Sequence, residues 1–250
     1  MEARLALELK KAGQKNFVIE CMDINAPMLE RGIVNARRLG VAGHLGFFES
    51  DFNSWTPTNH YDVILANQCL HHVLELEHLF ASCQQAMIAS SRFLTSDMVG
   101  RNGHQRWPEA LELVRDFWTE LPRKYRYNRL LKRYEDNYIN HDCSREGFEG
   151  IRAQDILPLL NENFSFELFI PFANVVNVFI DRAFGWNFDE NAAWDMDFID
   201  RVHAADENAM LNGSIKPTQI LAALRKSEFS EAPKLWHQRM TPEFCTRVTT

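Results

Sequence analysis

The sequence lacks several features that would place the protein in a specialised class. It has no excess of basic residues: the formal net charge is -7, which argues against a general nucleic-acid binder with a basic face. No apolar run approaches the ~20 residues of a membrane-spanning helix. Met1 opens a charged amphipathic segment and not a signal peptide. We therefore expect no nucleic-acid partner, no membrane association and a cytoplasmic location.

Paired cysteines are also lacking. The five cysteines are scattered, odd in number and never in a CxxC pair. This pattern is typical of reduced thiols and not of a disulfide framework or a zinc site, so we expect no bound metal. The 18 Phe and 6 Trp that are present indicate large aromatic clusters or an apolar pocket.

Helical and strand-like segments alternate over the first hundred residues. Helical spacing covers residues 1–12, 27–39 and 76–89, and short strand-like runs cover 17–22, 44–49, 61–66 and 92–96. The run over 61–66 is apolar enough for a buried parallel strand. This alternation predicts an α/β fold with a Rossmann-like, mostly parallel sheet and helices on both faces.

Residues 100–143 interrupt this alternation and are rich in aromatic and basic side chains. We expect two helices there, either a pair with a solvated basic face or a lid over a substrate pocket. A helix over 153–161, a strand over 164–169 and an acidic surface helix over 187–208 are expected next, and 219–225 fits either a strand or a helix. The predicted organisation is a cofactor-binding half (1–100), a helical cap insertion (101–149), the C-terminal half of the same domain (150–226) and a tail (227–250).

Two acidic residues follow neighbouring predicted strands. Asp23 ends the first strand, where a carboxylate can accept hydrogen bonds from both hydroxyls of a ribose. Asp51, followed by Phe52, ends the next strand and can accept a hydrogen bond from an adenine amino group. Each also has a structural explanation: Asp23 can stabilise the start of the next helix, and Asp51 can form a turn.

A polar stretch directly follows the run over 61–66. Asn67 can hydrogen-bond an amino acid moiety, and either His71 or His72 can take a proton from a substrate, because imidazole titrates near neutral pH. His104 is a third candidate base. The alternative is that the two adjacent histidines cap and pack under the next helix. Adjacent histidines point in different directions, so a shared metal would need further ligands.

The runs FVIECMDINAPMLERG, FFESDF and YDVILANQCLHHV together resemble the class I S-adenosylmethionine-dependent methyltransferases. The resemblance implies S-adenosylmethionine as cofactor, with Asp23 on its ribose, Ile24 packed against its adenine, Asp51 and Phe52 in contact with the adenine, and Asn67 beside the methyl donor. The ending IKPTQILAALRK is similar to that family's last antiparallel strand, which settles 219–225 as a strand.

One departure from the family pattern is evident. The glycine-rich loop and the first strand that precede the ribose-binding acid in that family have no counterpart before Asp23. In the family this strand lies between the strands that match 17–22 and 61–66. Its removal leaves backbone groups unpaired or forces the two neighbours together.

Three functions are therefore compared. The first is a methyltransferase that acts on a small-molecule acceptor, impaired if the front of the domain is truncated. The second is a non-catalytic binding or assembly module of the same fold. The third is a nicotinamide-dependent oxidoreductase, which the segments YDVILANQCLHHV and KPTQILAALRK do not favour. The oligomeric state is left open.

Overall fold

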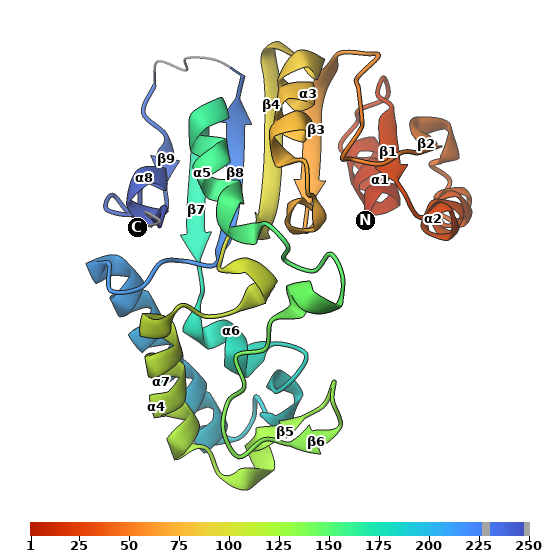
Figure 1. Ribbon diagram of the computed structural model, residues 1–250. Helices are drawn as coiled ribbons and strands as arrows, with labels where there is room; N and C mark the ends of the chain where they lie inside the picture. Colours follow the sequence, from red (N-terminus) through yellow and green to blue (C-terminus); the bar gives the residue numbers. More distant parts are fainter. Residues whose placement is uncertain (227–230, 248–250) are drawn as a thin grey trace. The chain divides into compact units, whose positions relative to one another are not determined.

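The computed structural model describes residues 1–226 and 231–247 and divides the chain into two compact units, Met1–Thr56 and Pro57–Thr250. The first unit holds four main elements, α1 (Glu2–Lys11), β1 (Ile19–Asp23), α2 (Ala26–Arg38) and β2 (Leu45–Glu49) (Figure 1). β1 and β2 pair in parallel, with Asp23 opposite Glu49. These elements confirm the expected order of helices and strands in this part of the chain.

Local sequence explains why α2 begins where it does. The side chain of Asn25 accepts a hydrogen bond from the Met28 N–H at 3.1 Å, as an N-cap residue does. Pro27 stands in the first turn, where its missing N–H costs least. The core of the unit is small, because the fully buried side chains contributed by α1, α2 and the following loop are only alanines and one valine: Ala3, Ala6, Ala36 and Val41.

The second unit is built on a five-stranded sheet with the strand order β3-β4-β8-β7-β9. Its strands are β3 (Tyr61–Asn67), β4 (Met87–Met98), β7 (Ser165–Phe172), β8 (Gln219–Arg225) and β9 (Lys234–Leu235). β3 pairs in parallel with β4 and β7 with β9, whereas β8 is antiparallel to both of its neighbours. The predicted Rossmann-like α/β class with an antiparallel last strand is confirmed.

The helices of this unit interleave with the strands. The α-helices are α3 (Leu76–Ala86), α4 (Pro108–Glu120), α5 (Ala153–Asn163), α6 (Val175–Ile180), α7 (Ala193–Asn212) and α8 (Pro242–Cys245). Short 3-10 turns include η2 (Leu70–His72), η3 (Asn102–His104), η4 (Arg123–Arg126), η5 (Cys143–Glu146) and η6 (Gly185–Asn187). Over residues 1–226 and 231–247, no helix combines the length and the apolar character needed to cross a membrane.

The prediction that residues 61–66 form a buried strand is wrong. β3 is the terminal strand of its sheet, so a neighbouring strand covers it on one side only. Val63 and Leu65, which lie two residues apart on one face, are 51% and 46% exposed. β4 is longer than expected, because the preceding helix α3 ends at Ala86 and not near residue 89.

The prediction of two helices between Gly100 and Cys143 is also wrong. α4 is one helix, and it is followed by η4 and a two-stranded ribbon of β5 (Tyr127–Asn128) and β6 (Arg133–Tyr134). Asn128 turns the chain here, since its side-chain oxygen accepts the N–H groups of Leu130 and Leu131 at 3.1 and 3.0 Å. The helical cap therefore reduces to α4 and a ribbon.

Aromatic side chains of this region form a core. Phe117 of α4 packs edge-on against Phe179 of α6 and Phe198 of α7, with ring centroids 6.4 and 6.0 Å away. Trp118 of α4 lies tilted against Phe179 at 6.3 Å. α7 is not wholly a surface helix as predicted, because its Asp195 and Asp206 are buried. The predicted tail over 227–250 contains β9 and α8, and its residues 227–230 and 248–250 lie outside the described part.

Candidate functional site

The two strand-end carboxylates follow neighbouring strands of the first unit. Asp23 is the last residue of β1, and its carbonyl accepts the Ser50 N–H at 3.2 Å, one residue before Asp51. Asp23 Oδ1 accepts the Asn25 N–H at 2.8 Å, and Asp51 Oδ1 accepts the Asn53 N–H at 2.9 Å. One oxygen of each carboxylate thus stabilises a local turn, which leaves Oδ2 as the atom for a ligand hydroxyl or amino group.

Apolar side chains stand beside these carboxylates. Ile24 directly follows Asp23 and is 64% exposed, which is unusual for a large aliphatic side chain next to a sheet. Phe52 follows Asp51 and is half-buried. An adenine ring held by the two carboxylates would cover such side chains, so the residues present fit the nucleoside part of S-adenosylmethionine.

The carboxyl ends of β3 and β4 carry the polar residues of the second unit. Asn67 ends β3 opposite Ser96 of β4, and Asp97 follows Ser96. Gln68, the residue after Asn67, has φ +52°, a left-handed conformation that is uncommon for a residue other than glycine. Such strained backbone concentrates at functional sites.

Asp97 fixes the orientation and tautomer of His71. Its fully buried carboxylate accepts the N–H groups of Cys69 and Leu70, each at 2.8 Å, through Oδ2. Oδ1 accepts the ring Nδ1–H of His71 at 2.6 Å. Because a carboxylate only accepts hydrogen bonds, Nδ1 of His71 carries the proton. The lone pair of the neutral ring therefore lies on Nε2, which can bind a proton or a metal ion.

Three further side chains surround His71. His104 Nε2 donates to Glu149 Oε1 at 3.1 Å, and His71 Nε2 lies 4.0 Å from the same oxygen. The ring of His72 lies against that of His71, with centroids 4.1 Å apart and planes inclined by 45°, and its Nδ1 donates to the Phe148 carbonyl at 3.0 Å. His71 itself is buried, whereas the side chains of His72 and Glu149 are 43% and 44% exposed. We call His71, His104 and Glu149 the His–Glu cluster.

The environment sets the charge of two members of this cluster. Burial lowers the pKa of His104, and the charge that His71 would carry when protonated acts in the same direction, so the His104 imidazole is neutral near pH 7. Burial acts to raise the pKa of Glu149, but the hydrogen bond from His104, together with the charges that the nearby histidines would carry when protonated, outweighs burial and lowers the pKa. Glu149 is therefore an ionised carboxylate at neutral pH.

Backbone hydrogen bonds hold the loops of the cluster together. The Gly103 N–H donates to the Gly150 carbonyl at 2.9 Å, and the Ile151 N–H donates to the His71 carbonyl at 3.1 Å. Gly150 has φ +68°, and a Cβ there would lie 2.9 Å from Cε1 of His104, so only glycine fits without a shift. His104 has φ +57°, a second strained position beside the site.

The structure thus brings His71, His72 and His104 together, and places Asp23, Ile24, Asp51 and Phe52 in the other unit. Sequence reasoning missed Asp97 and Glu149. A signal for Asp97 existed, because it is an acid at the end of a predicted strand, as Asp23 is. Glu149 carries no local signal: it lies 45 residues from His104, in a loop after η5.

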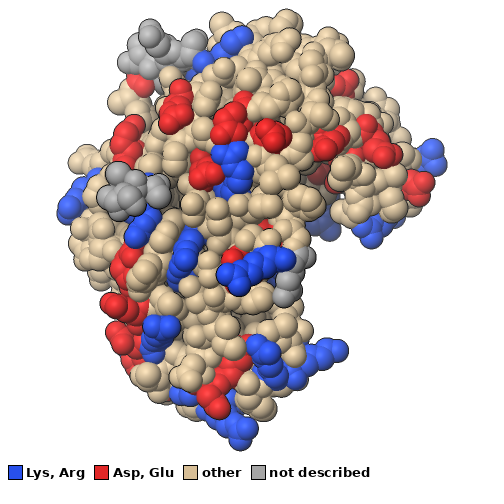
Figure 2. Space-filling model, viewed as in Figure 1, with Lys and Arg blue, Asp and Glu red and all other residues tan. Residues whose placement is uncertain are grey.

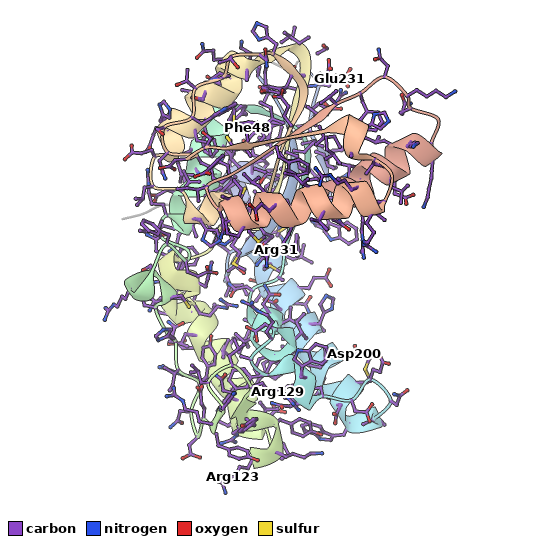
Figure 3. The ribbon with its side chains drawn as sticks, turned by 90° about the vertical axis from the view of Figure 1, so that its right-hand side faces the viewer. Arg31, Phe48, Arg123, Arg129, Asp200 and Glu231 are labelled. Carbon is purple, nitrogen blue, oxygen red and sulfur yellow. The ribbon has the colours of Figure 1, made fainter. Side chains whose placement is uncertain are left out.

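The basic residues of the cap are mostly engaged in local structure. Blue side chains gather at the end of the second unit that carries η4 and the ribbon, and Arg123 and Arg129 are labelled there in Figure 3 (Figures 2 and 3). The guanidinium of Arg123 lies over the ring of Tyr134 at 4.9 Å, and Arg129 donates to Asn187 Oδ1 at 2.8 Å. These contacts account for the basic cluster without a ligand.

A surface hollow of about 470 Å³ runs along the outer face of α2 in the first unit. Its lining includes Glu30, Arg31, Val34 and Arg38, and Arg31 is labelled on this helix in Figure 3. None of the lining residues is a predicted site residue. The hollow is shallow and one-sided, so we do not assign the chemistry to it.

Comparison with known proteins gives one family match. Residues 2–95 match a family model described as a methyltransferase domain. Over that segment the match bears out the resemblance to class I S-adenosylmethionine-dependent methyltransferases. No match is found among curated protein sequences.

Solved structures with a similar fold include three methyltransferases. The StiE O-methyltransferase domain is 12% identical, with a TM-score of 0.48, and the match covers 91% of this chain and 64% of that one. Geranyl diphosphate C-methyltransferase from Streptomyces coelicolor, solved with Mg²⁺, geranyl diphosphate and S-adenosyl-L-homocysteine, is 10% identical (TM-score 0.49, 89% and 66% covered). An O-methyltransferase from a multienzyme of Brevibacillus brevis, solved with S-adenosyl-L-homocysteine, is 12% identical (TM-score 0.47, 88% and 61%).

The chain spans less than two thirds of the length of each of these three proteins. At these identities and TM-scores the likenesses do not assign an activity or a substrate.

Proposed function

We propose that this protein is an S-adenosylmethionine-dependent methyltransferase that acts on a small-molecule acceptor. The observation that carries the proposal is the placement of Asp23 and Asp51 after neighbouring parallel strands, within a segment that matches methyltransferase domains. Ligands of open α/β sheets bind beyond the carboxyl ends of the strands, where both carboxylates lie. Oδ2 of Asp23 is assigned to the ribose hydroxyls, and Asp51 with Phe52 and Ile24 to the adenine.

The cofactor, when bound, supplies an activated methyl group, and the protein supplies positioning and removal of a proton. We assign the removal of the proton from the acceptor's nucleophile to the neighbourhood of His71. Asp97 is a positioning residue: it holds the Nδ1 proton in place and would stabilise a positive charge on the ring. His72 and His104, the other two candidate bases, pack against the His71 ring.

The acidic net charge of -7 supports a small acceptor over a nucleic acid. The aromatic residues of the cap say nothing about the shape of the acceptor, because Phe117 and Trp118 are buried in the core of the second unit. Release of S-adenosylhomocysteine, measured in the presence of either the low-molecular-mass or the macromolecular fraction of a cell extract, tests the acceptor class. Turnover with the macromolecular fraction alone would contradict the proposal.

Calorimetry with S-adenosylmethionine and S-adenosylhomocysteine tests the cofactor site. Asp23→Ala removes charge-assisted hydrogen bonds worth about 1.5–3 kcal/mol, so we expect affinity to fall roughly 10- to 100-fold. Glu49→Ala is the matched control, because Glu49 is an exposed carboxylate opposite Asp23 at the same end of β2. Equal affinities for the Asp23→Ala and Glu49→Ala variants would show that the assigned site is wrong.

A further inference from the structure

The His–Glu cluster has the composition and convergence of a metal site. One ligand atom from each of His71, His104 and Glu149 lies within 4.8 Å of the others. The three residues come from η2, from η3 and from the loop between η5 and α5, so separate segments of the second unit meet at one point. Two imidazoles and one carboxylate form a common ligand set for divalent zinc, iron, cobalt or nickel.

Asp97 supplies the outer support that such sites use. A metal-binding histidine usually donates its second ring N–H to a carboxylate, which fixes the ring and raises the basicity of the ligating nitrogen. His71 has this arrangement, with its Nδ1–H on the buried Asp97 carboxylate at 2.6 Å. Its Nε2 lone pair faces Glu149 Oε1 at 4.0 Å.

The distances from Glu149 to the two imidazoles are close to those around a common ion, and all three ligand atoms lie within 4.8 Å of one another. Ligand bonds of about 2.0–2.2 Å place neighbouring ligand atoms roughly 3–3.5 Å apart in tetrahedral or octahedral geometry. His104 Nε2 and Glu149 Oε1 are already 3.1 Å apart. The 4.0 Å between His71 Nε2 and Glu149 Oε1 would need to shorten by about 0.5–1 Å, which a rotation of the half-exposed Glu149 side chain provides.

The backbone also holds the ligands in place before any ion binds. The backbone N–H of Gly103 donates a hydrogen bond to the Gly150 carbonyl. The backbone N–H of Ile151, two residues after Glu149, donates to the His71 carbonyl. His104 is held at φ +57°, at a cost that its surroundings must offset. Loops and a ligand residue that are held in place in this way fix the positions of the ligand atoms, as a site with a defined geometry requires.

We propose that His71 Nε2, His104 Nε2 and the Glu149 carboxylate bind a divalent transition-metal ion, with Asp97 as the residue that orients His71. On metal binding the proton of the neutral His104 ring moves from Nε2 to Nδ1, so that Nε2 becomes the ligand atom and its hydrogen bond to Glu149 is replaced by the metal. Three protein ligands leave at least one coordination position for an oxygen, which the metal would acidify. That this oxygen belongs to the methyl acceptor rests on the proposed function. The metal site itself rests on the geometry alone. This site would overturn the expectation of no metal, because His104 and Glu149 are the further ligands that the adjacent histidines lacked.

Titration of the chelator-treated protein with Zn²⁺ and Co²⁺ tests the proposal. We expect saturable binding, a rise in melting temperature with Zn²⁺, and visible absorption bands from Co²⁺ in a site of histidine and carboxylate. Glu149→Gln and His104→Ala should each weaken binding by 10-fold or more, and Asp97→Asn by roughly 10- to 100-fold. The controls are His203→Ala and Glu207→Gln, which change exposed residues of α7 and should leave affinity unchanged.

Glu149→Gln keeps the proposal testable if His104→Ala fails to fold, because the Glu149 side chain is half-exposed and glutamine has the same shape. The proposal is overturned if the parent protein binds neither ion, or if Glu149→Gln binds Zn²⁺ as tightly as the parent. A protein that binds S-adenosylmethionine but no metal refutes this inference and leaves the proposed function standing. Zinc binding without any binding of S-adenosylmethionine refutes the proposed function and leaves the metal site.

Discussion

Replacing Asp97 tests how far one carboxylate organises the second unit. Asp97→Ala removes an acceptor used by the N–H groups of Cys69, Leu70 and Met98 and by the His71 ring. Leu70 and His71 are buried, so water cannot replace these two bonds. Each bond to a charged acceptor contributes about 1.5–3 kcal/mol, which gives a loss of about 3–6 kcal/mol. Relief from burying the carboxylate reduces this value, and we expect a loss of about 3–5 kcal/mol in the free energy of unfolding.

Urea unfolding of the parent protein and the Asp97→Ala, Asp97→Asn, His71→Ala and double variants measures this effect. Asp97→Asn keeps an acceptor oxygen and should cost less than Asp97→Ala. The double-mutant cycle of Asp97 and His71 should give a coupling of about 1–3 kcal/mol, because the two residues share a buried hydrogen bond. A loss below about 1 kcal/mol for Asp97→Ala, or no coupling to His71, would refute the argument that this carboxylate orients the ring.

Three other predictions follow from burial and backbone geometry. Burial raises the pKa of the Cys21 thiol to about 11 and those of the Cys83 and Cys245 thiols to about 12. Alkylation near pH 8, followed by peptide mass spectrometry, should therefore modify the half-buried Cys69 and Cys143 first. Early labelling of Cys83 would contradict this expectation. Asp206 accepts hydrogen bonds from the backbone N–H groups of Asn174, Val175 and Val176 at the start of α6. Asp206→Ala should therefore lower the free energy of unfolding by about 2–4 kcal/mol. The control is Asp200→Ala, on an exposed part of α7 (Figure 3), which should change the free energy of unfolding by less than about 0.5 kcal/mol. Gly150→Ala should cost about 1–2 kcal/mol in thermal or urea unfolding, since φ is +68° and the new Cβ meets His104, while Gly43→Ala meets nothing within 4 Å and should be close to neutral.

Local rules predicted the first unit well. Asn25 as N-cap, Pro27 in the first turn and short strand-like runs all act over a few residues, so the sequence specifies α2, β1 and β2 directly. Composition left β8 open as a strand or a helix, and only the family resemblance settled it as the strand that lies between β4 and β7. The acids that end β1 and follow β2 were found because strand ends are visible in the sequence.

Predictions that depend on tertiary packing were weaker. The ribbon of β5 and β6 arises from the buried pair of Asn128 and Glu135, which no periodicity indicates. Exposure of β3 depends on its place at the end of the sheet and not on its composition. Glu149 could not be assigned, because its contact with His104 joins loops 45 residues apart.

The left-handed backbone of His104 also bears on protein engineering. A residue other than glycine in this conformation carries a penalty of roughly 1–2 kcal/mol, so a library selected for heat resistance alone will favour glycine at this position. Selection for chemistry will instead retain the imidazole. Opposite outcomes of two such selections at codon 104 would show how much folding stability this protein gives up by keeping the imidazole there.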